Sequence, residues 1–186
     1  MTVAGLALDT SNQSTIVLLR DPSGRRQVPI WIDNEQAHNI VAGLRQTQTD
    51  KPLAHDLMLS LLNAGDLQLE KVIINKIELS TFQAILKVLP KRIICKKPEE
   101  NSKSFIEIEA RPSDAIALAV RAKCSIWMYE QVVVEASIPV DEEADVKDQD
   151  EFKQFLDKIS PSDLIRHIKR SNQFNENKSQ QPESEL

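Results

Sequence analysis

The chain has 186 residues, of which 41% are hydrophobic and 27% are charged, a composition typical of one globular domain that can bury a sizeable core. Its formal net charge is −5, and because basic and acidic residues balance in residues 1–140, the negative charge lies entirely in residues 141–186. A neutral main domain argues against a protein that grips nucleic acid through bulk positive charge, although it leaves room for a local basic patch.

The first half of the chain predicts three strands followed by two helices. Strands are expected over residues 3–8, 14–19 and 25–32, and the turn residues Asp21-Pro22-Ser23-Gly24 join the last two. Apolar residues at helical spacing predict helices over residues 33–45 and 52–63.

The second half continues with strands and one strongly apolar helix. Strands are expected over residues 67–79, 81–89, 105–110 and 125–128, with a helix over 113–122 that has Ser113 as its N-cap and a helical turn over 129–136. Strict strand–helix alternation is missing. We therefore predict an α+β domain over residues 1–140, with a mixed, largely antiparallel sheet.

Residues 141–186 differ from this domain in composition. We interpret residues 141–151 as an acidic linker, 152–170 as a short helical appendage and the polar residues 171–186 as a disordered tail. The apolar positions of residues 152–170 predict docking on the domain or on a protein partner.

The predicted cellular location of the protein rests on two sequence features that we do not find, a membrane span and a secretory signal. No stretch approaches the roughly 18 apolar residues of a membrane span, and the first residues do not resemble a secretory signal. The two cysteines, Cys95 and Cys124, lack metal-site spacing and lie in or beside apolar stretches. We expect free thiols in a soluble cytoplasmic protein without membrane contact.

The most informative stretch begins at Arg111-Pro112-Ser113-Asp114, directly behind the acidic strand that carries Glu107 and Glu109. A strand that turns at once into a helix gathers charge and free backbone N–H groups, which can bind a phosphate or orient a metal. Capping alone also explains the pattern, because Pro-Ser-Asp recurs at residues 161–163. Arg111 either clamps a phosphate or pairs with Glu109 or Asp114.

A second candidate is His55-Asp56, in the first turn of the second predicted helix. His55 there can serve as a general base or a metal ligand, and Asp56 can bind a cation. The alternative is a pair that only caps the helix. Trp31 alternates with apolar residues and is interpreted as a core or interface residue. The only basic cluster has no interleaved aromatic residue and comprises Lys87, Lys91, Arg92, Lys96, Lys97 and Lys103.

Taken together, these motifs resemble the bifunctional nuclease domain family over about residues 3–137. The matching pieces are residues 28–32, 35–37, 51–57 and, most specifically, 109–119. The resemblance implies an α+β domain that forms a dimer or a higher homo-oligomer and degrades DNA and RNA. Three positions depart from the family pattern: Ala54 replaces a usual Thr, Glu109 replaces a usual Asp, and Asp33 stands where a Gly is common.

Two hypotheses follow. In the first, the protein is a nuclease of low sequence selectivity, assisted by Mg²⁺ or Mn²⁺. Its metal ligands or water-orienting carboxylates would be Asp56, Glu109 and Asp114, with His55 as base or acid and Arg111 as phosphate clamp. In the second, the domain is a non-catalytic regulatory or ligand-binding oligomer in which the same cluster binds an anion or organises the assembly.

Overall fold

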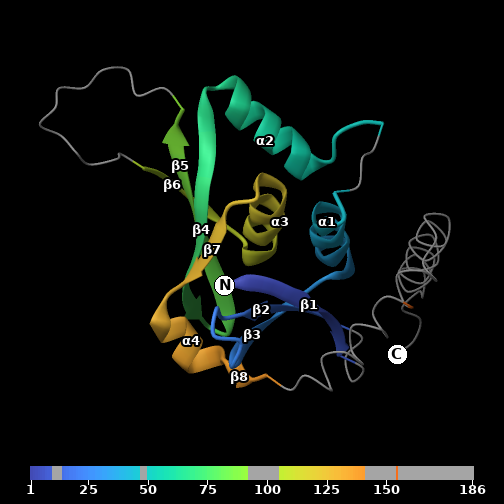
Figure 1. The fold of residues 1–186 in the computed structure, drawn as a ribbon, viewed down its shortest axis with the longest axis vertical. Coiled ribbons are helices and arrows are strands. Elements are labelled where there is room, and N and C mark those ends of the chain that lie inside the picture. Colours follow the sequence, from blue (N-terminus) through green and yellow to red (C-terminus); the bar gives the residue numbers. More distant parts are fainter. Residues whose placement is uncertain (10–13, 47–49, 92–104, 141–153, 155–186) are drawn as a thin grey trace, which may run out of the picture.

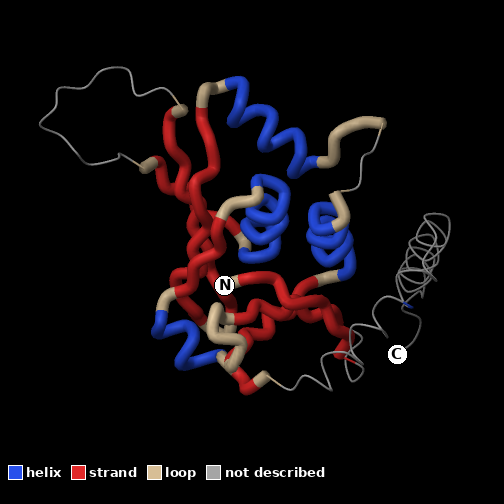
Figure 2. Tube along the Cα trace, in the orientation of Figure 1, coloured by secondary structure: helices blue, strands red, loops and turns tan. Residues whose placement is uncertain are grey.

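The structure is a computed structural model that describes residues 1–9, 14–46, 50–91, 105–140 and 154. Within these residues the chain forms two four-stranded sheets and four helices, which confirms the α+β class (Figures 1 and 2). The predicted linker, appendage and tail lie outside the described residues, apart from residue 154. None of the described helices is both long and apolar enough to cross a membrane.

The first sheet is antiparallel and has the strand order β1-β2-β3-β8. Its strands are β1 (Thr2–Asp9), β2 (Ser14–Arg20), β3 (Arg26–Ile32) and β8 (Ile138–Pro139). In β3 the residues Val28, Ile30 and Ile32 are buried while Trp31 between them is exposed. This alternation shows that one face of the sheet covers the core and the other faces outward.

The second sheet is mixed and has the strand order β6-β5-β4-β7, with β7 parallel to β4. Its strands are β4 (Leu67–Glu78), β5 (Thr81–Pro90), β6 (Ile106–Ala110) and β7 (Ser125–Met128). The predicted strands are thus all present, but they divide between two sheets. The short strand β8 was not predicted, because two residues carry no periodicity.

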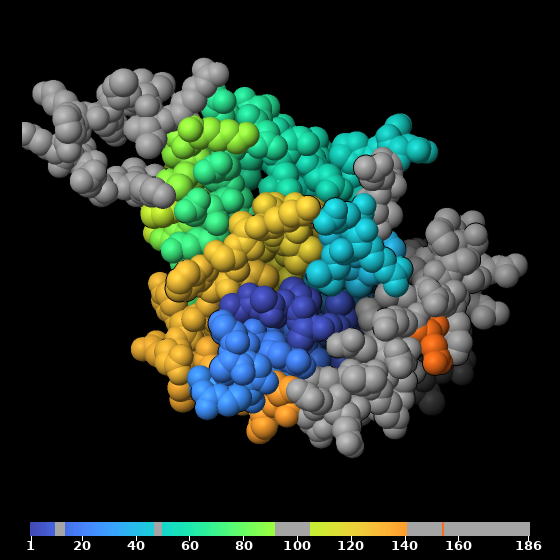
Figure 3. All heavy atoms as spheres, viewed as in Figure 1, coloured from blue at the N-terminus to red at the C-terminus, as the bar shows by residue number. Residues whose placement is uncertain are grey.

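The helices are α1 (Asn34–Leu44), α2 (Ala54–Ala64), α3 (Pro112–Ala122) and α4 (Glu130–Ala136). The central helix is α3, in which every residue from Ala115 to Ala119 is buried against side chains from both sheets. Figure 3 shows the yellow atoms of the α3 region lying between the blue first sheet, the cyan α1 and the green second sheet. The fold therefore fixes the N-terminus of α3 between the two sheets.

The helix starts are set by local chemistry. The Asp33 carboxylate accepts from the Gln36 backbone N–H at 2.7 Å, and the Gln36 side chain accepts from the Asp33 N–H at 3.1 Å, which forms a capping box for α1. The prediction of Ser113 as the N-cap of α3 was wrong. Arg111 is the N-cap, Pro112 occupies the first helical position and Ser113 is buried. Pro fits the first position because that N–H has no partner within a helix.

The turn between β4 and β5 carries backbone strain. It has two residues, Leu79 (φ 48°) and Ser80 (φ 61°), and both lie in the left-handed region although neither is glycine. Two-residue hairpins of this type favour Asn-Gly, because L side chains rarely adopt positive φ. Leu79 is also 96% exposed, so packing does not compensate for its conformation.

We predict that Leu79→Asn combined with Ser80→Gly raises the free energy of unfolding by about 1 kcal/mol, because both new residues tolerate positive φ. Urea titration of both proteins measures this change. The control is Leu79→Ala, which removes the exposed leucine without favouring positive φ. A double variant no more stable than the Ala control would contradict the explanation by backbone strain.

Candidate active site

The candidate site begins where β6 passes into α3. The Ala115 N–H donates to the Arg111 carbonyl at 3.0 Å, which closes the first turn of the helix. The N-cap is Arg111, and its side chain makes no capping hydrogen bond. Asp114 lies in the first turn, where the helix dipole favours a negative charge. The junction therefore presents an arginine, a carboxylate and a helix start together.

Asp114 is bound on both carboxylate oxygens. Arg111 Nε donates to Asp114 Oδ2 at 2.7 Å, and His55 Nε2 lies 3.3 Å from Asp114 Oδ1. The Arg111 side chain is 68% exposed, whereas the His55 side chain is only 6% exposed. The structure therefore connects three of the predicted residues in one series of contacts, from the exposed Arg111 through Asp114 to the buried His55. The hydrogen bond and charge of Asp114 raise the pKa of Arg111 above its ordinary value.

His55 lies below the protein surface. It is the buried residue of α2, and its Nδ1 atom is buried without a hydrogen-bond partner among the described residues. Because its Nε2 faces Asp114, the imidazole can orient that carboxylate or exchange a proton with it. In this arrangement His55 reaches a substrate only through Asp114.

Asp56 points to a different partner. Arg121 Nε donates to Asp56 Oδ1 at 3.0 Å, and the Leu53 N–H donates to Asp56 Oδ2 at 3.2 Å. The second bond caps the first turn of α2, as the alternative interpretation of His55-Asp56 proposed for this residue. Asp56 thus holds the start of α2 while its neighbour His55 reaches Asp114.

Arg121 is the residue that the sequence analysis missed. Its side chain is only 5% exposed, and besides Asp56 its Nη1 donates to the Asn39 carbonyl at 2.7 Å and the Ala117 carbonyl at 3.1 Å. A Cβ on Gly43 would lie 2.9 Å from Arg121 Nη1, so a larger residue at this position would require the guanidinium to shift. A signal was present in the sequence, because Arg121 directly follows the apolar residues Ala115 to Val120 of the same helix.

The acidic residues of β6 take no part in the contacts that join Arg111, Asp114 and His55. Glu107 forms an ion pair with Lys87 on the neighbouring strand, and the exposed Glu109 lies opposite Ile85. Among the described residues, no three His, Cys, Asp or Glu side chains form a group that could hold a metal ion. The three predicted metal ligands are therefore distributed over different surroundings: Asp114 with Arg111 and His55, Asp56 with Arg121, and Glu109 on β6.

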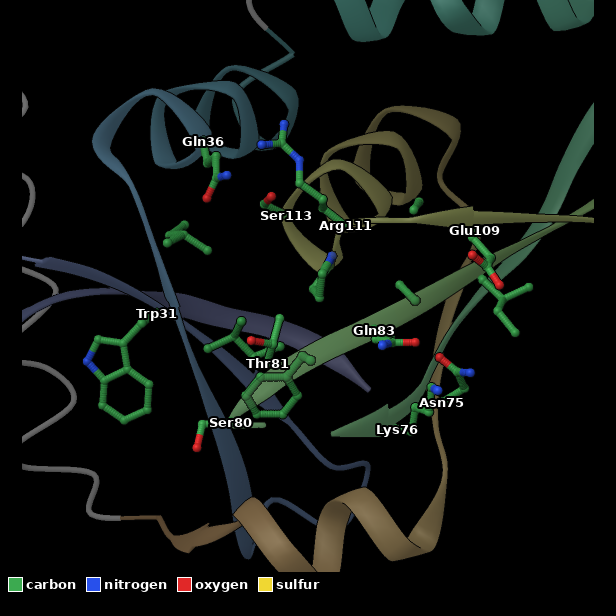
Figure 4. Close-up of a pocket in the computed structure, with 17 residues that line it drawn as sticks. Trp31, Gln36, Asn75, Lys76, Ser80, Thr81, Gln83, Glu109, Arg111 and Ser113 are labelled. Atoms are coloured by element: carbon green, nitrogen blue, oxygen red, sulfur yellow. The ribbon is translucent and has the colours of Figure 1, made fainter. Parts of the chain in front are cut away.

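A cavity of about 810 Å³ adjoins Arg111 and Glu109 (Figure 4). Its walls come from β3, the start of α1, the β4–β5 hairpin and the β6–α3 junction. Asp114 and His55 do not line this cavity and connect to it through Arg111. The volume falls within the range of small-molecule sites.

The described part of the basic cluster is not free of aromatic neighbours. Lys87 Nζ lies 5.8 Å from the centre of the Phe105 ring. Lys71, which is not part of the predicted cluster, has its Nζ 5.0 Å from the centre of the Trp127 ring. These contacts are within the reach of cation–π interactions. Residues 92–104, with the remaining lysines, lie outside the described residues.

Cys124 does not have the character of a nucleophile. Burial raises the pKa of its thiol from 9.0 to about 11. Because the thiolate is the reactive form, the thiol is almost fully protonated at neutral pH. This agrees with the interpretation of Cys124 as a free thiol beside the core.

Comparisons with known proteins agree with these motifs. A family model described as "Bifunctional nuclease domain" matches residues 17–141. Two proteins of Mycobacterium tuberculosis are each 30% identical to this chain over 170 residues: "Uncharacterized protein MT1877" of strain CDC 1551 / Oshkosh and "Uncharacterized protein Rv1829" of strain ATCC 25618 / H37Rv. Each alignment covers 87% of this chain and 95% of the relative.

We predict that Asp56→Ala lowers the free energy of unfolding by about 3 kcal/mol, because it leaves the buried Arg121 guanidinium without its counter-ion and removes the cap of α2. Denaturant titration measures the loss. The control is Glu130→Ala, which breaks an exposed ion pair with Arg26 and should cost less than about 1 kcal/mol. Equal losses in the two variants would contradict the assigned role of Arg121.

We further predict that Cys124 reacts with iodoacetamide about 100-fold more slowly at pH 8 than a thiol of ordinary pKa, because its thiolate fraction is lower by that factor. The measurement uses Cys95→Ser protein and mass spectrometry. The rate should rise with pH up to about 11, the pKa of the buried thiol. Unfolding in guanidinium chloride should remove the difference; fast labelling of the folded protein would contradict the burial of this thiol.

Proposed function

The chain belongs to the bifunctional nuclease domain family, and from this premise we propose that it hydrolyses phosphodiester bonds of DNA and RNA with low sequence selectivity. The observation that supports the proposal most is the pair of Arg111 and Asp114 at the start of α3, in which Arg111 lines the cavity and Asp114 is hydrogen-bonded to it. A cation for the phosphate and a carboxylate for the attacking water stand side by side there.

The chemistry assigns one task to each side chain. Arg111 binds the non-bridging phosphate oxygens and neutralises the charge that grows on them in the transition state, and the helix dipole of α3 adds to this effect. Asp114 orients a water molecule and accepts its proton as the new P–O bond forms. The bond to the leaving sugar oxygen breaks in the same step, and bulk water protonates that oxygen.

His55 serves as the support of Asp114 in this scheme. It faces the oxygen that Arg111 does not bind, so the carboxylate is fixed from two directions. A carboxylate whose orientation is already fixed loses little freedom when the water is activated, which favours the reaction. The imidazole of His55 can also take up the proton that Asp114 accepts from the water.

Assistance by Mg²⁺ or Mn²⁺ stays a prediction of the sequence. The described residues do not gather the ligand set that such an ion prefers, since Asp56 is bound by Arg121 and Glu109 stands apart. We therefore assign no step to a metal and give Asp56 a positioning role. The effect of added metal and of chelator is measured directly in the test below.

The second candidate is a non-catalytic, ligand-binding oligomer. One observation favours it: Leu57, Met58 and Leu61 form an exposed apolar stretch on α2. Exposed apolar patches are common at protein interfaces. In this case Arg111 binds an anion without turnover, and the predicted self-association and the partner of residues 152–170 become the main function.

We predict that Asp114→Asn lowers the hydrolysis rate of single-stranded DNA and RNA by about 100-fold or more, because the amide cannot accept the proton of the water. Highly purified wild type and variant are compared with Mg²⁺, with Mn²⁺ and with EDTA. Glu130→Gln, a carboxylate paired with Arg26 outside the cavity, is the matched control and should keep full activity.

Each outcome of this comparison supports or contradicts the site and the function assigned above. Activity that is lost only in Asp114→Asn supports the assigned site, and its loss in EDTA adds the metal. Equal activity in folded wild type and Asp114→Asn would place the activity elsewhere or in a contaminant. A wild type without activity under all three conditions would leave the second candidate.

A further inference from the structure

The outward face of the first sheet is apolar. Side chains alternate along a strand, so Leu18, which lies between two fully buried residues of β2, points to the face opposite the core. The cross-strand partner of Leu18 in β3 is Pro29, and Trp31 lies opposite Ile16. Four apolar side chains of neighbouring strands therefore point to this one face.

Trp31 lies across this face. Its side chain is 55% exposed, so the interpretation of Trp31 as a core residue is wrong. Its Nε1 donates to Asp9 Oδ2 at 3.3 Å, and because β2 separates β3 from β1, the ring reaches over β2 to make this bond. Figure 4 shows the ring on the far side of β3 from the other residues that line the cavity. A large, exposed aromatic surface of this kind is typical of an interface.

The composition of β2 is that of a strand covered on both faces. Its residues 16–19 form an unbroken apolar run, whereas a strand with one solvated face alternates apolar and polar residues. Ile40 of α1 and Ile116 of α3 belong to the same core cluster as Val28 of β3, so these two helices cover the inner face. The sequence of β2 therefore indicates that a further apolar element covers the outward face.

The chain leaves the domain beside this sheet. β8 pairs with β3, and the Val140 N–H donates to the Arg25 carbonyl at 3.1 Å. Residues 141–151, which follow, can span at most about 40 Å, whereas a strand of the length of β3 measures about 23 Å. The outward face thus lies within reach of residue 152. The exposed apolar stretch on α2 lies at the opposite end of the molecule from β8 (Figure 1).

Residues 152–159 have the sequence pattern of an element that could cover this face. Phe152, Phe155, Leu156 and Ile159 have the spacing of one apolar helix face. Gln154, the one residue beyond 140 that the structure describes, is helical and exposed. In a helix over residues 152–159, Gln154 would lie on the side opposite the four apolar residues. Its exposure agrees with an apolar face that is turned toward the protein.

Charge also favours a position of this segment beside the first sheet. Residues 141–151 contain seven acidic residues and one basic residue. They begin beside the exposed Arg25 and Arg26, since Pro139 pairs with Arg26 in the sheet. Arg26 also forms an ion pair with Glu130. The two arginines attract the acidic residues to the end of the sheet from which residues 152–159 can reach its outward face.

We propose that residues 152–159 of this chain dock as a helix on the outward face of the first sheet, with their apolar side against Trp31, Ile16 and Pro29. The sheet then forms a middle layer, with α1 and α3 on one face and this helix on the other. A helix this short is marginal in water alone, so the docked contact also stabilises the helix. The inference does not depend on the nuclease, because this face lies on the other side of β3 from the cavity.

The two tryptophans allow a test on the full chain, because Trp127→Phe leaves Trp31 as its only indole. In this protein docking shields Trp31 from water, and quenching of its fluorescence by acrylamide measures the shielding. We expect Phe155→Asp to raise the quenching constant by about twofold or more, since a carboxylate without a partner is not stable in an apolar contact. The matched control is Gln154→Asp, which adds the same charge on the opposite side of the predicted helix and should leave quenching unchanged.

Trypsin cleavage after Lys153 and Lys158 tests the same contact from the side of the sheet. We expect Trp31→Ala to accelerate this cleavage by about tenfold, because cleavage follows the population of the undocked segment. Trp127 is 56% exposed, almost as much as Trp31, but it lies in the second sheet. Trp127→Ala should therefore leave the cleavage rate unchanged. Far-UV circular dichroism checks that both variants are folded.

Shielding of Trp31 that persists when the protein is diluted and is lost in Phe155→Asp but not in Gln154→Asp supports docking within one chain. Three results would overturn the proposal. They are a Trp31 that is equally quenched with and without Phe155→Asp, equal cleavage rates in the two Ala variants, and shielding that is lost on dilution, which would assign this face to a second copy. The quenching measurement does not depend on the folding of any Trp31 variant.

Discussion

The buried guanidinium of Arg121 is the interaction on which the arrangement of the site depends. It binds the carbonyl of Asn39 in α1, the carboxylate of Asp56 in α2 and the carbonyl of Ala117 in its own helix α3. A buried charge is stable only when such partners surround it, so the three helices must keep their relative positions. That geometry brings His55, one residue from Asp56, to Asp114 across 59 positions of sequence.

Much of the fold was predictable because its signals are local. The strand over residues 125–128 and the helix that follows Asp33 come from alternation, helical spacing and caps within a few residues. The division into two sheets was not predictable in the same way. It depends on pairs such as β4 with β7, which join Val72 to Ile126 in parallel, and no local pattern states which strands will pair.

The site shows the same limit at the scale of single residues. Arg111 and Asp114 were predictable as a pair, because three residues apart at a helix start are neighbours in space. Glu109 is as near to Arg111 in sequence, but it lies on a strand and faces a different direction. Asp56 and His55 are adjacent, yet successive residues of a helix point about 100° apart, so one meets Arg121 and the other Asp114. Closeness in sequence therefore does not show which of the carboxylates Asp56, Glu109 and Asp114 share a site. The direction of the backbone at each residue decides which side chains meet.

The geometry of the Arg111–Asp114 pair bears on how an anion can enter. The hydrogen bond to Asp114 uses Nε, while the side chain as a whole is largely exposed. The terminal guanidinium nitrogens, which form the other edge of the planar fork, remain directed away from that bond. A phosphate can then bind the outer edge without displacing Asp114. An ion pair that only braced the helix start would work equally well with lysine, whereas binding two groups at once requires the fork of arginine.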